Sequence, residues 1–347
     1  MPKPAKIAIV ILNWNGEKLF DTFLPSVIQY STSENIEIIV ADNGSTDKSI
    51  EHLNRFFPSV KIIDLKTNYG FAEGYNQAIQ QVDADYLVLL NSDVKVTERW
   101  IQPCIERFET DEKLVAIQPK ILSYNQPGLF EYAGAAGGFI DMFGYPFCRG
   151  RILNRIEEDL GQYNQPSQIF WATGACMFVR ASAFKIAGGF DGDFWAHMEE
   201  IDLCWRLKNR GYKVAYEPKS VVYHLGGGTL SYGSPKKIYL NFRNNLFMLF
   251  KNLPRNQFTR IFFARMVLDG VAAAKFILGF NFREFRAVIK AHFSFYQNLG
   301  KLMRKRKEIQ KHVIVKNHPE VYPQSIMWKF FIQKKRRFSD LKFQPKS

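Results

Sequence analysis

The sequence has few cysteines and no long uncharged apolar run, and each absence excludes a class of protein. Its four cysteines are widely spaced and form no CxxC or Cys/His pattern, so we expect neither a zinc site nor a disulfide framework. The first residues run directly into a strand-like segment, which is not the pattern of a secretory signal. Residues 259–280 come nearest to a membrane span, but Arg265, Asp269 and Lys275 interrupt them. We therefore expect an amphipathic or packed helix there.

Charge of the two signs is unevenly distributed along the chain. From residue 231 onward there are 25 Lys and Arg but 5 Asp and Glu, whereas the first 230 residues hold 22 Lys and Arg and 28 Asp and Glu. A slightly acidic domain is therefore followed by a strongly basic tail, which we expect to face polyanions. Because the tail also carries apolar runs, an anionic membrane surface fits it better than nucleic acid does.

Strand and helix signals alternate over the first hundred residues. The continuous apolar run at 8–14 is typical of a strand that is buried on both faces, and 36–43 and the strongly apolar 86–93 also indicate strands. Amphipathic segments between them predict helices. This β-α-β order predicts an α/β fold with a Rossmann-like, doubly wound, mostly parallel sheet. Residues beyond about 235 have the pattern of basic, aromatic helices.

Polar motifs follow several of these strands. NWNG at 13–16, ADNGSTD at 41–47 and LLNSD at 89–93 each come directly after an apolar run. Ligands of open α/β sheets bind beyond the carboxyl ends of the strands. At that edge Asp93 is able to hold Mg²⁺ or Mn²⁺ together with phosphate oxygens, although a turn aspartate is the alternative. ADNGSTD is explained equally well as a helix cap.

Two later motifs carry further candidate groups. HMEEIDLCWR, which starts at residue 197, places Glu199 and Asp202 on one helix face. A cluster of acids raises the pKa of one member, as a general base requires, but acids at a solvated helix start also favour the helix dipole. His224 follows a strand and precedes three glycines. Such a histidine is often structural, yet beside Asp93 it is a suitable ligand for Mn²⁺.

Together, and in this order, the motifs resemble the family-2 inverting glycosyltransferases of the GT-A fold, particularly the bacterial rhamnosyltransferase-like members. The resemblance implies a GT-A domain over 1–253, with a nucleotide-sugar half at about 1–115 and an acceptor half at about 116–253. It implies metal-dependent transfer of a sugar from dTDP-rhamnose or a UDP-sugar to a saccharide or polyprenyl-diphosphate-linked acceptor in cell-surface polysaccharide synthesis. The basic tail over 254–347 would then rest on the inner face of the cell membrane, with the protein in the cytoplasm.

The resemblance also assigns roles to residues. LLNSD occupies the place of the DxD motif, with Asn91 at the first Asp, so Asp93 would bind the metal and His224 would complete its shell. The acidic pair of the family falls on Glu199 and Glu200, and the second member usually acts as the base. Since that position commonly holds Asp, the choice among three acids stays open; they are Glu200, Glu199 and Asp202.

Two further groups of residues would bind substrate by the same likeness. The nucleotide and donor sugar would contact Asn13, Asn15, Asp42, Asn43, Asp47, Asn68, Gly70, Asn76, Asn91 and Ser92. The acceptor or a diphosphate would contact Trp171, Thr173, Gly174, Gly189, Asp191, Arg243 and Asn244.

Three alternatives stay open from the sequence. A sugar-nucleotide-forming nucleotidyltransferase would need a glycine-rich, basic phosphate loop after the first strand, and NWNGEKLF is not one. A nucleic-acid-binding protein would use the basic tail, and no nucleic acid is expected because of the apolar runs there. A sugar-nucleotide-binding module without transferase activity would not need the acids at positions 93, 199 and 200.

Overall fold

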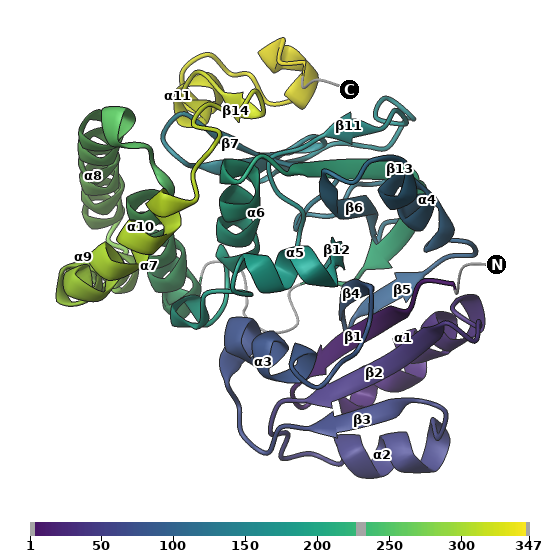
Figure 1. Ribbon diagram of the computed structural model, residues 1–347. Coiled ribbons are helices and arrows are strands. Elements are labelled where there is room, and N and C mark those ends of the chain that lie inside the picture. Colours follow the sequence, from purple (N-terminus) through teal and green to yellow (C-terminus); the bar gives the residue numbers. More distant parts are fainter. Residues whose placement is uncertain (1–3, 227–233, 345–347) are drawn as a thin grey trace.

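The computed structural model describes residues 4–226 and 234–344, and a large twisted sheet forms its centre (Figure 1). Four parallel strands make one half of this sheet: β3 (Lys61–Asp64), β2 (Ile36–Asp42), β1 (Ile7–Asn13) and β4 (Tyr86–Asn91). The other half continues through β12 (Cys176–Arg180), β6 (Leu114–Ser123), β13 (Lys213–His224) and β11 (Ser167–Gln168), with β5 (Val94–Val96) paired to β13. β12 is antiparallel to both of its neighbours, whereas β6 and β13 are parallel.

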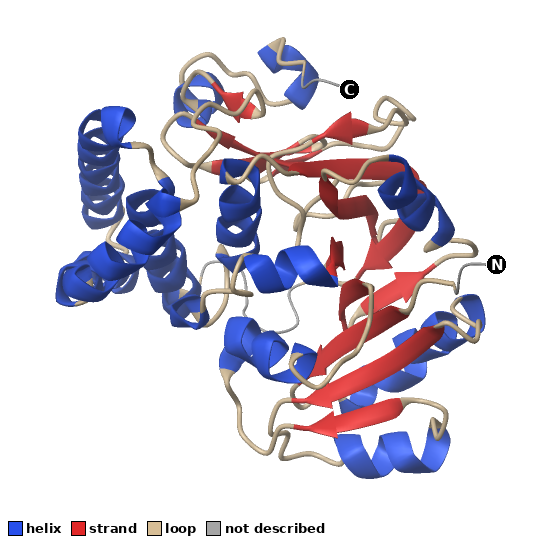
Figure 2. Ribbon diagram, viewed as in Figure 1, coloured by secondary structure: helices blue, strands red, loops and turns tan. Residues whose placement is uncertain are grey.

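Helices cover both faces of the sheet, as Figure 2 shows. Alternate residues of β1 enter different hydrophobic cores, with Val10 on one face and Ile9 on the other, which is why the strand is a continuous apolar run. One core includes side chains from α1 (Glu17–Tyr30), α2 (Ser49–Phe56) and α4 (Gln102–Thr110). The opposite core includes side chains from α3 (Gly70–Ile79), α5 (Ala181–Ile186), α6 (Glu199–Asn209) and α7 (Pro235–Asn252). The predicted α/β sheet is therefore confirmed.

Two local signals of the sequence are not followed by the structure. A proline inside a helical segment commonly kinks or ends the helix, but Pro25 lies inside α1, which continues to Tyr30. Ser45 and Thr46 in ADNGSTD are residue types that cap helices, yet α2 begins after Lys48 and has no side-chain cap. The Ser45 hydroxyl instead accepts hydrogen bonds from Asn13 and Asn15, because the turn folds back over the end of β1.

The basic C-terminal region consists of helices that pack on one another at one side of the sheet (Figure 1). It comprises α8 (Arg255–Leu278), α9 (Phe282–Gln297) and α10 (Leu299–Lys311), which follow α7. Two of the three charges that interrupt the apolar run of α8 are buried: Arg265 pairs with Asp269 at 2.7 Å, and His292 lies 3.2 Å from the same carboxylate, whereas Lys275 is exposed. Among the described residues, no helix has the length and apolar character that a membrane span requires.

The last residues return to the first part of the chain. β14 (Val321–Tyr322) pairs with β7 (Gly138–Asp141) in a second sheet of five strands, which also contains β8 (Pro146–Cys148), β9 (Arg151–Ile152) and β10 (Arg155–Ile156). After α11 (Ile326–Phe331), a 3₁₀ turn over Phe338–Leu341 buries Phe338 against Phe139 and Phe147. The basic region is therefore packed onto the domain and is not a free extension.

Candidate active site

The carboxyl ends of β1 and β2 form a hydrogen-bonded corner. The Asn13 side-chain amide donates to Asp42 Oδ1 at 2.9 Å, and the backbone amide of Ser45 donates to Asp42 Oδ2 at 2.9 Å. Asn15 accepts the backbone amide of Thr46 at 2.7 Å through its Oδ1. Asp42 is almost fully buried, so the structure shows it shaping the turn beyond the two strands. Its contact with a nucleotide stays a prediction.

Asp47 lies at the outer part of the same corner. Its carboxylate accepts the backbone amides of Glu17 and Ser49, both at 3.1 Å, and so connects the starts of α1 and α2. Partial burial raises the pKa of Asp47, but the hydrogen bonds from the Ser49 hydroxyl and from these amides outweigh it, so the pKa lies below its ordinary value. The helix-start interpretation of ADNGSTD therefore holds for Asp47 at least.

The start of α3 forms a second group of predicted donor-binding residues. Asn43 donates to the Gly70 carbonyl at 2.9 Å, and Asn68 accepts the Gly70 amide at 2.8 Å. Gly70 has φ +76°, and a Cβ there would lie 2.6 Å from the Trp195 ring, so both the backbone conformation and the close approach require glycine. The side chain of Asn76 bonds to both the amide and the carbonyl of Phe190, at 2.9 Å each. These contacts fasten α3 to the segment that precedes α6.

That segment, residues 189–198, is here named the pre-α6 loop. Trp195, His197 and Met198 have φ values of 65°, 70° and 73°, in the left-handed region that residues with a Cβ rarely adopt. Asn244 holds the loop in place: its side-chain amide lies 2.7 Å from the His197 carbonyl, 2.9 Å from that of Ala196 and 3.0 Å from that of Phe194. Such conformations persist only where the surroundings over-determine them, and they concentrate at active sites.

Arg243 supports the same loop. One guanidinium nitrogen donates to the carbonyls of Asp193 and Phe194, both at 2.9 Å. The sequence suggested that Arg243 and Asn244 contact an acceptor phosphate or the donor diphosphate. The structure shows them holding backbone, and it shows Asn244 fully buried.

Glu199 and Glu200 lie directly after the pre-α6 loop, in the first turn of α6. In each, Oε2 is buried and has no hydrogen-bond partner within the described residues. Burial raises the pKa of both, and the charge of Glu200 raises that of Glu199 further. Backbone amides of residues 198, 200 and 201 favour the charged form of Glu200, whose pKa nevertheless rises to about 7. Glu200 is therefore the member of the pair that ionises near neutral pH.

Asp202, the third candidate base, is fully buried and already paired. Its carboxylate lies 2.8 Å from Arg206 Nε and 3.0 Å from Lys251 Nζ, and it accepts a hydrogen bond from Asn252 at 2.7 Å. The side chains of Arg206 and Lys251 pair with this carboxylate inside the fold. Asp202 is thus placed to anchor α6, and the free carboxyl oxygens belong to Glu199 and Glu200.

Asp93 and His224 meet at the end of β4, as their motifs predicted. Asp93 Oδ1 lies 3.1 Å from His224 Nε2, and Asn91 lies 3.4 Å from the same ring nitrogen. Burial lowers the pKa of His224, but two carboxylates outweigh it and raise that pKa to about 10. The second carboxylate belongs to Glu131, whose Oε2 lies 3.1 Å from His224 Nδ1. Sequence reasoning missed Glu131, because it lies in an irregular segment without a periodic pattern.

The described residues contain no group of three or more His, Cys, Asp and Glu side chains arranged to hold a metal ion. Asp93 and Glu131 contact opposite nitrogens of His224, so the three do not converge on one point. The donor set nonetheless fits a divalent ion that shares its shell with a diphosphate, since Mg²⁺ takes only one or two carboxylates in such sites. Glu131 at Nδ1 orients the ring so that Nε2 faces Asp93, as carboxylates behind metal-binding histidines do.

The remaining predicted acceptor residues fall into two groups. The first group, Trp171, Thr173 and Gly174, packs against other parts of the protein. Trp171 Nε1 donates to the Phe139 carbonyl at 2.9 Å, and a Cβ on Gly174 would lie 3.0 Å from the Phe71 ring. Asp191, in the pre-α6 loop, forms ion pairs with Lys251 and Lys305. Gly189 contributes a carbonyl to Arg206, and Ser92 lies in the turn between β4 and β5. None of these positions has a tested substrate contact, so their binding roles stay predictions.

Residues 8–186 match the sequence model of Glycosyl transferase family 2. An N-acetylglucosaminyl-diphospho-decaprenol L-rhamnosyltransferase of Mycobacterium tuberculosis is 26% identical over 237 residues, which are 63% of this chain and 75% of that protein. A poly-beta-1,6-N-acetyl-D-glucosamine synthase of Staphylococcus aureus is 28% identical over 226 residues, which are 65% of this chain and 51% of the synthase. The chain thus spans about half the length of that second relative.

Solved structures share the fold at low sequence identity. S. aureus TarS 1–349 in complex with UDP-GlcNAc has a TM-score of 0.56 at 15% identity, covering 89% of this chain and 84% of TarS 1–349. The mannosyltransferase PcManGT of Pyrobaculum calidifontis, in complex with GDP-Man and Mn²⁺, has a TM-score of 0.52 at 13% identity, covering 90% and 86%. With the family model matching more than half of its residues, the chain belongs to Glycosyl transferase family 2 and is a glycosyltransferase.

Proposed function

We propose that the protein is a metal-dependent inverting transferase, which moves a sugar from a nucleotide-sugar donor to a lipid-linked saccharide acceptor in cell-surface polysaccharide synthesis. The observation that carries the proposal is the glutamate pair at the start of α6. Glu200 has a free carboxyl oxygen and a pKa of about 7, and it follows a loop that is fastened to the nucleotide-binding edge. A nucleotide-binding module without transfer chemistry would not need a carboxylate with this pKa.

In the proposed reaction Glu200 accepts the proton of the acceptor hydroxyl as its oxygen attacks the anomeric carbon. The bond between that carbon and the leaving diphosphate breaks in the same step, so the configuration inverts. Glu199, whose pKa is raised further, stays protonated beside it. Mg²⁺ or Mn²⁺ held by Asp93 and His224 would neutralise charge on the diphosphate. The solved relatives with Mn²⁺ and a nucleotide or nucleotide sugar support this choice of ion.

The donor and the acceptor are proposed at the level of their chemical class. The mycobacterial relative is named for a rhamnosyl donor and a diphospho-decaprenol acceptor, which supports dTDP-rhamnose and a polyprenyl-diphosphate-linked saccharide. TarS was solved with UDP-GlcNAc, which supports a UDP-sugar. The corner around Asn13 and Asp42 would receive the nucleotide, because it lies beyond the strand ends where α/β sheets bind such ligands.

A thermal-shift panel tests the donor site. UDP-, dTDP- and GDP-sugars are each added with and without Mn²⁺ to the wild type, to Asp93→Asn, and to Asp64→Asn as a control at the end of β3. A nucleotide sugar at a hundred times its Kd stabilises the native state by about 2.7 kcal/mol, which raises Tm by about 4 °C in a chain of this length. We expect that shift for one nucleotide with Mn²⁺ in the wild type and in the control. An equal shift in Asp93→Asn would contradict the metal site.

We further propose that the α8–α9 turn rests on an anionic membrane. Leu278, Phe280 and Phe282 are 80%, 81% and 55% exposed at this turn, and Arg283 follows them. Burying three such side chains in lipid supplies about 1.5–3 kcal/mol each, and each nearby cation adds about 1 kcal/mol at an anionic surface. Vesicle sedimentation with the three changed to Ser tests this. The matched control is Phe56→Ser/Leu160→Ser/Ile186→Ser on the catalytic domain. Equal loss of binding in both triple variants would exclude the turn as the contact.

A further inference from the structure

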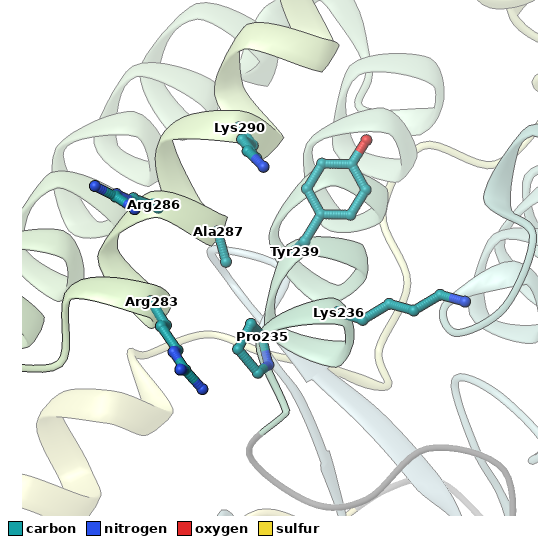
Figure 3. A pocket seen from close by; sticks show the side chains of 7 residues that line it. All are labelled: Pro235, Lys236, Tyr239, Arg283, Arg286, Ala287 and Lys290. Atoms are coloured by element: carbon teal, nitrogen blue, oxygen red, sulfur yellow. The ribbon is translucent and has the colours of Figure 1, made fainter.

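A cavity of about 450 Å³ lies between the first turn of α7 and α9, outside the site described above. Figure 3 shows Pro235 and Tyr239 of α7 on one side and Ala287 of α9 on the other, with cations at the rim. The side chain of Lys290 points toward Tyr239 across the space, whereas Lys236 extends away from it. The cavity is lined by Pro235, Lys236, Tyr239, Arg283, Arg286, Ala287 and Lys290. Its lining thus combines aliphatic stems and a ring with the cations of Arg283 and Lys290, whereas the charged ends of Lys236 and Arg286 extend away from the space.

The cations of this cavity have no counter-charge among the residues that the structure describes. Within residues 4–226 and 234–344, Arg283, Arg286 and Lys290 form no hydrogen bond or ion pair, and no acid lines the cavity. By contrast, Lys301 and Lys305 of α10 are paired with aspartates of the pre-α6 loop. The positive charges of Arg283, Arg286 and Lys290 lie close together and repel one another unless an anion binds between them. The chemistry therefore calls for a ligand with more than one negative charge.

The position of the cations on α9 indicates that the ligand is also apolar. At 100° per residue, Phe282, Ile289 and Phe293 fall on one stripe of the helix, and all three are more than half exposed. Arg283, Arg286 and Lys290 fall on the adjacent stripe, between the exposed apolar stripe and the buried one that contains Ala287. A molecule bound here has anionic and hydrocarbon parts side by side. Inorganic phosphate would use only half of this surface.

Two contacts connect the cavity to the candidate active site. The ring of Tyr239 lies 5.3 Å from the Arg243 guanidinium, which holds the carbonyls of the pre-α6 loop. Lys236 Nζ lies 4.0 Å from the centre of the Trp195 ring, in the same loop. Arg283, at the other end of the cavity, directly follows the exposed α8–α9 turn. The cavity therefore extends from the proposed membrane contact toward the loop that directly precedes Glu199 and Glu200.

We infer that this cavity binds the diphosphate and the adjoining hydrocarbon of a lipid-linked acceptor, with Arg283 and Lys290 as the principal anion contacts. The inference rests on the proposed function and names where its acceptor sits. It replaces Arg243 and Asn244 as the acceptor-phosphate residues, since both are used to hold the pre-α6 loop. The sugar of the acceptor would then extend past Trp195 toward Glu200.

Binding of farnesyl diphosphate, measured by calorimetry in Mn²⁺ with and without saturating UDP, dTDP and GDP, tests the inference without donor or transfer. The wild type should bind it at least about tenfold more tightly than inorganic diphosphate, because burying even two methylene groups gives that factor. Arg283→Gln/Lys290→Gln should weaken binding about 10- to 100-fold, since each charged hydrogen bond accounts for about tenfold. Arg304→Gln/Lys307→Gln removes the same charge from α10 and should change binding less than about threefold.

Three outcomes would overturn the inference. Equal weakening by both double variants would mean that only the overall charge of the basic region matters. Displacement of farnesyl diphosphate by the nucleotides would place it in the donor site. If Arg283→Gln/Lys290→Gln loses sedimentation with phosphatidylglycerol vesicles but binds farnesyl diphosphate as tightly as the wild type, Arg283 and Lys290 bind membrane phospholipid instead. Donor binding at Asp93 is measured separately, so a failure here leaves the proposed transferase function standing.

Discussion

Asn244→Ala tests whether the pre-α6 loop is held in a conformation that the reaction needs. The Asn244 amide lies within 3.0 Å of three backbone carbonyls of the loop, and its own oxygen accepts Arg243 Nε at 2.8 Å. Removing the side chain leaves these buried carbonyls without their donor. The left-handed residues beside them, Trp195, His197 and Met198, then lose the restraint that opposes their strain.

The expected loss of stability follows from the contacts. An amide has two N–H groups, so two of the three contacts are fully formed at any moment. Two hydrogen bonds and the desolvated carbonyls together account for about 2–3 kcal/mol of the free energy of unfolding. In a chain of this length that loss lowers Tm by about 3–4 °C. The loss of activity should be larger than stability alone explains, because a displacement of about 1 Å at the reacting groups costs about a hundredfold in rate.

Asn245→Ala is the matched control on the same helix. Asn245 is equally buried, but its amide donates to the Gly144 carbonyl at 2.7 Å, away from the pre-α6 loop. Both variants should lose similar stability in urea melts. Only Asn244→Ala should speed hydrogen exchange at residues 193–200 and lower kcat for release of nucleoside diphosphate from the preferred donor. If the two variants lose kcat equally, or if exchange in the loop does not change, the loop is not held for catalysis by Asn244.

Two further predictions concern charge. Glu200→Gln should lower kcat by about 10²- to 10⁴-fold at unchanged donor binding. In the wild type, kcat should rise with pH and reach half its maximum near pH 7. The reason is that burial raises the pKa of Glu200 to about 7, and only the ionised carboxylate accepts a proton. A pH profile that is flat from 5 to 9 would contradict this role. Glu320→Gln should lower the free energy of unfolding by about 3–5 kcal/mol, because it leaves the buried ammonium of Lys208, 3.1 Å away, without its counter-charge and with only the Ile169 carbonyl as a hydrogen-bond acceptor. Glu308→Gln, in an exposed pair, should leave the urea midpoint almost unchanged, and equal urea midpoints for the two variants would refute the comparison.

The sheet and the meeting of Asp93 with His224 were predictable because their signals are local. β1, β2 and β4 are largely apolar segments, and each ends in the polar residues that the parallel topology brings to one edge. Asp93 and His224 are 131 positions apart, yet each follows a strand, and the two side chains meet at 3.1 Å. A polar residue directly after a strand can be recognised from the sequence without knowing which residue it meets in the fold.

The supporting residues were not predictable in the same way. Asn76 and Asn244 were expected to contact substrate, but both hold backbone, and a polar side chain in sequence looks the same in either role. Glu131 gives no periodic signal. The pairing of β14 with β7 joins two residues to a strand about 180 positions earlier, and so short a strand has no pattern of its own. Long-range contacts of this kind depend on the finished fold.

The return of the last residues to the second sheet affects when the enzyme becomes active during synthesis. α6 carries Glu199 and Glu200 at its start and Lys208 near its end, and Lys208 is neutralised by Glu320. A ribosome adding about 5–20 residues per second makes α6 several seconds before Glu320 emerges. During that interval Lys208 lacks the carboxylate that pairs with it in the finished fold, where both side chains are buried. The position of α6 is therefore not yet fixed. The start of α6, with Glu199 and Glu200, should therefore reach its final position late, when the segment that contains Glu320 has joined the C-terminal helices to the catalytic domain.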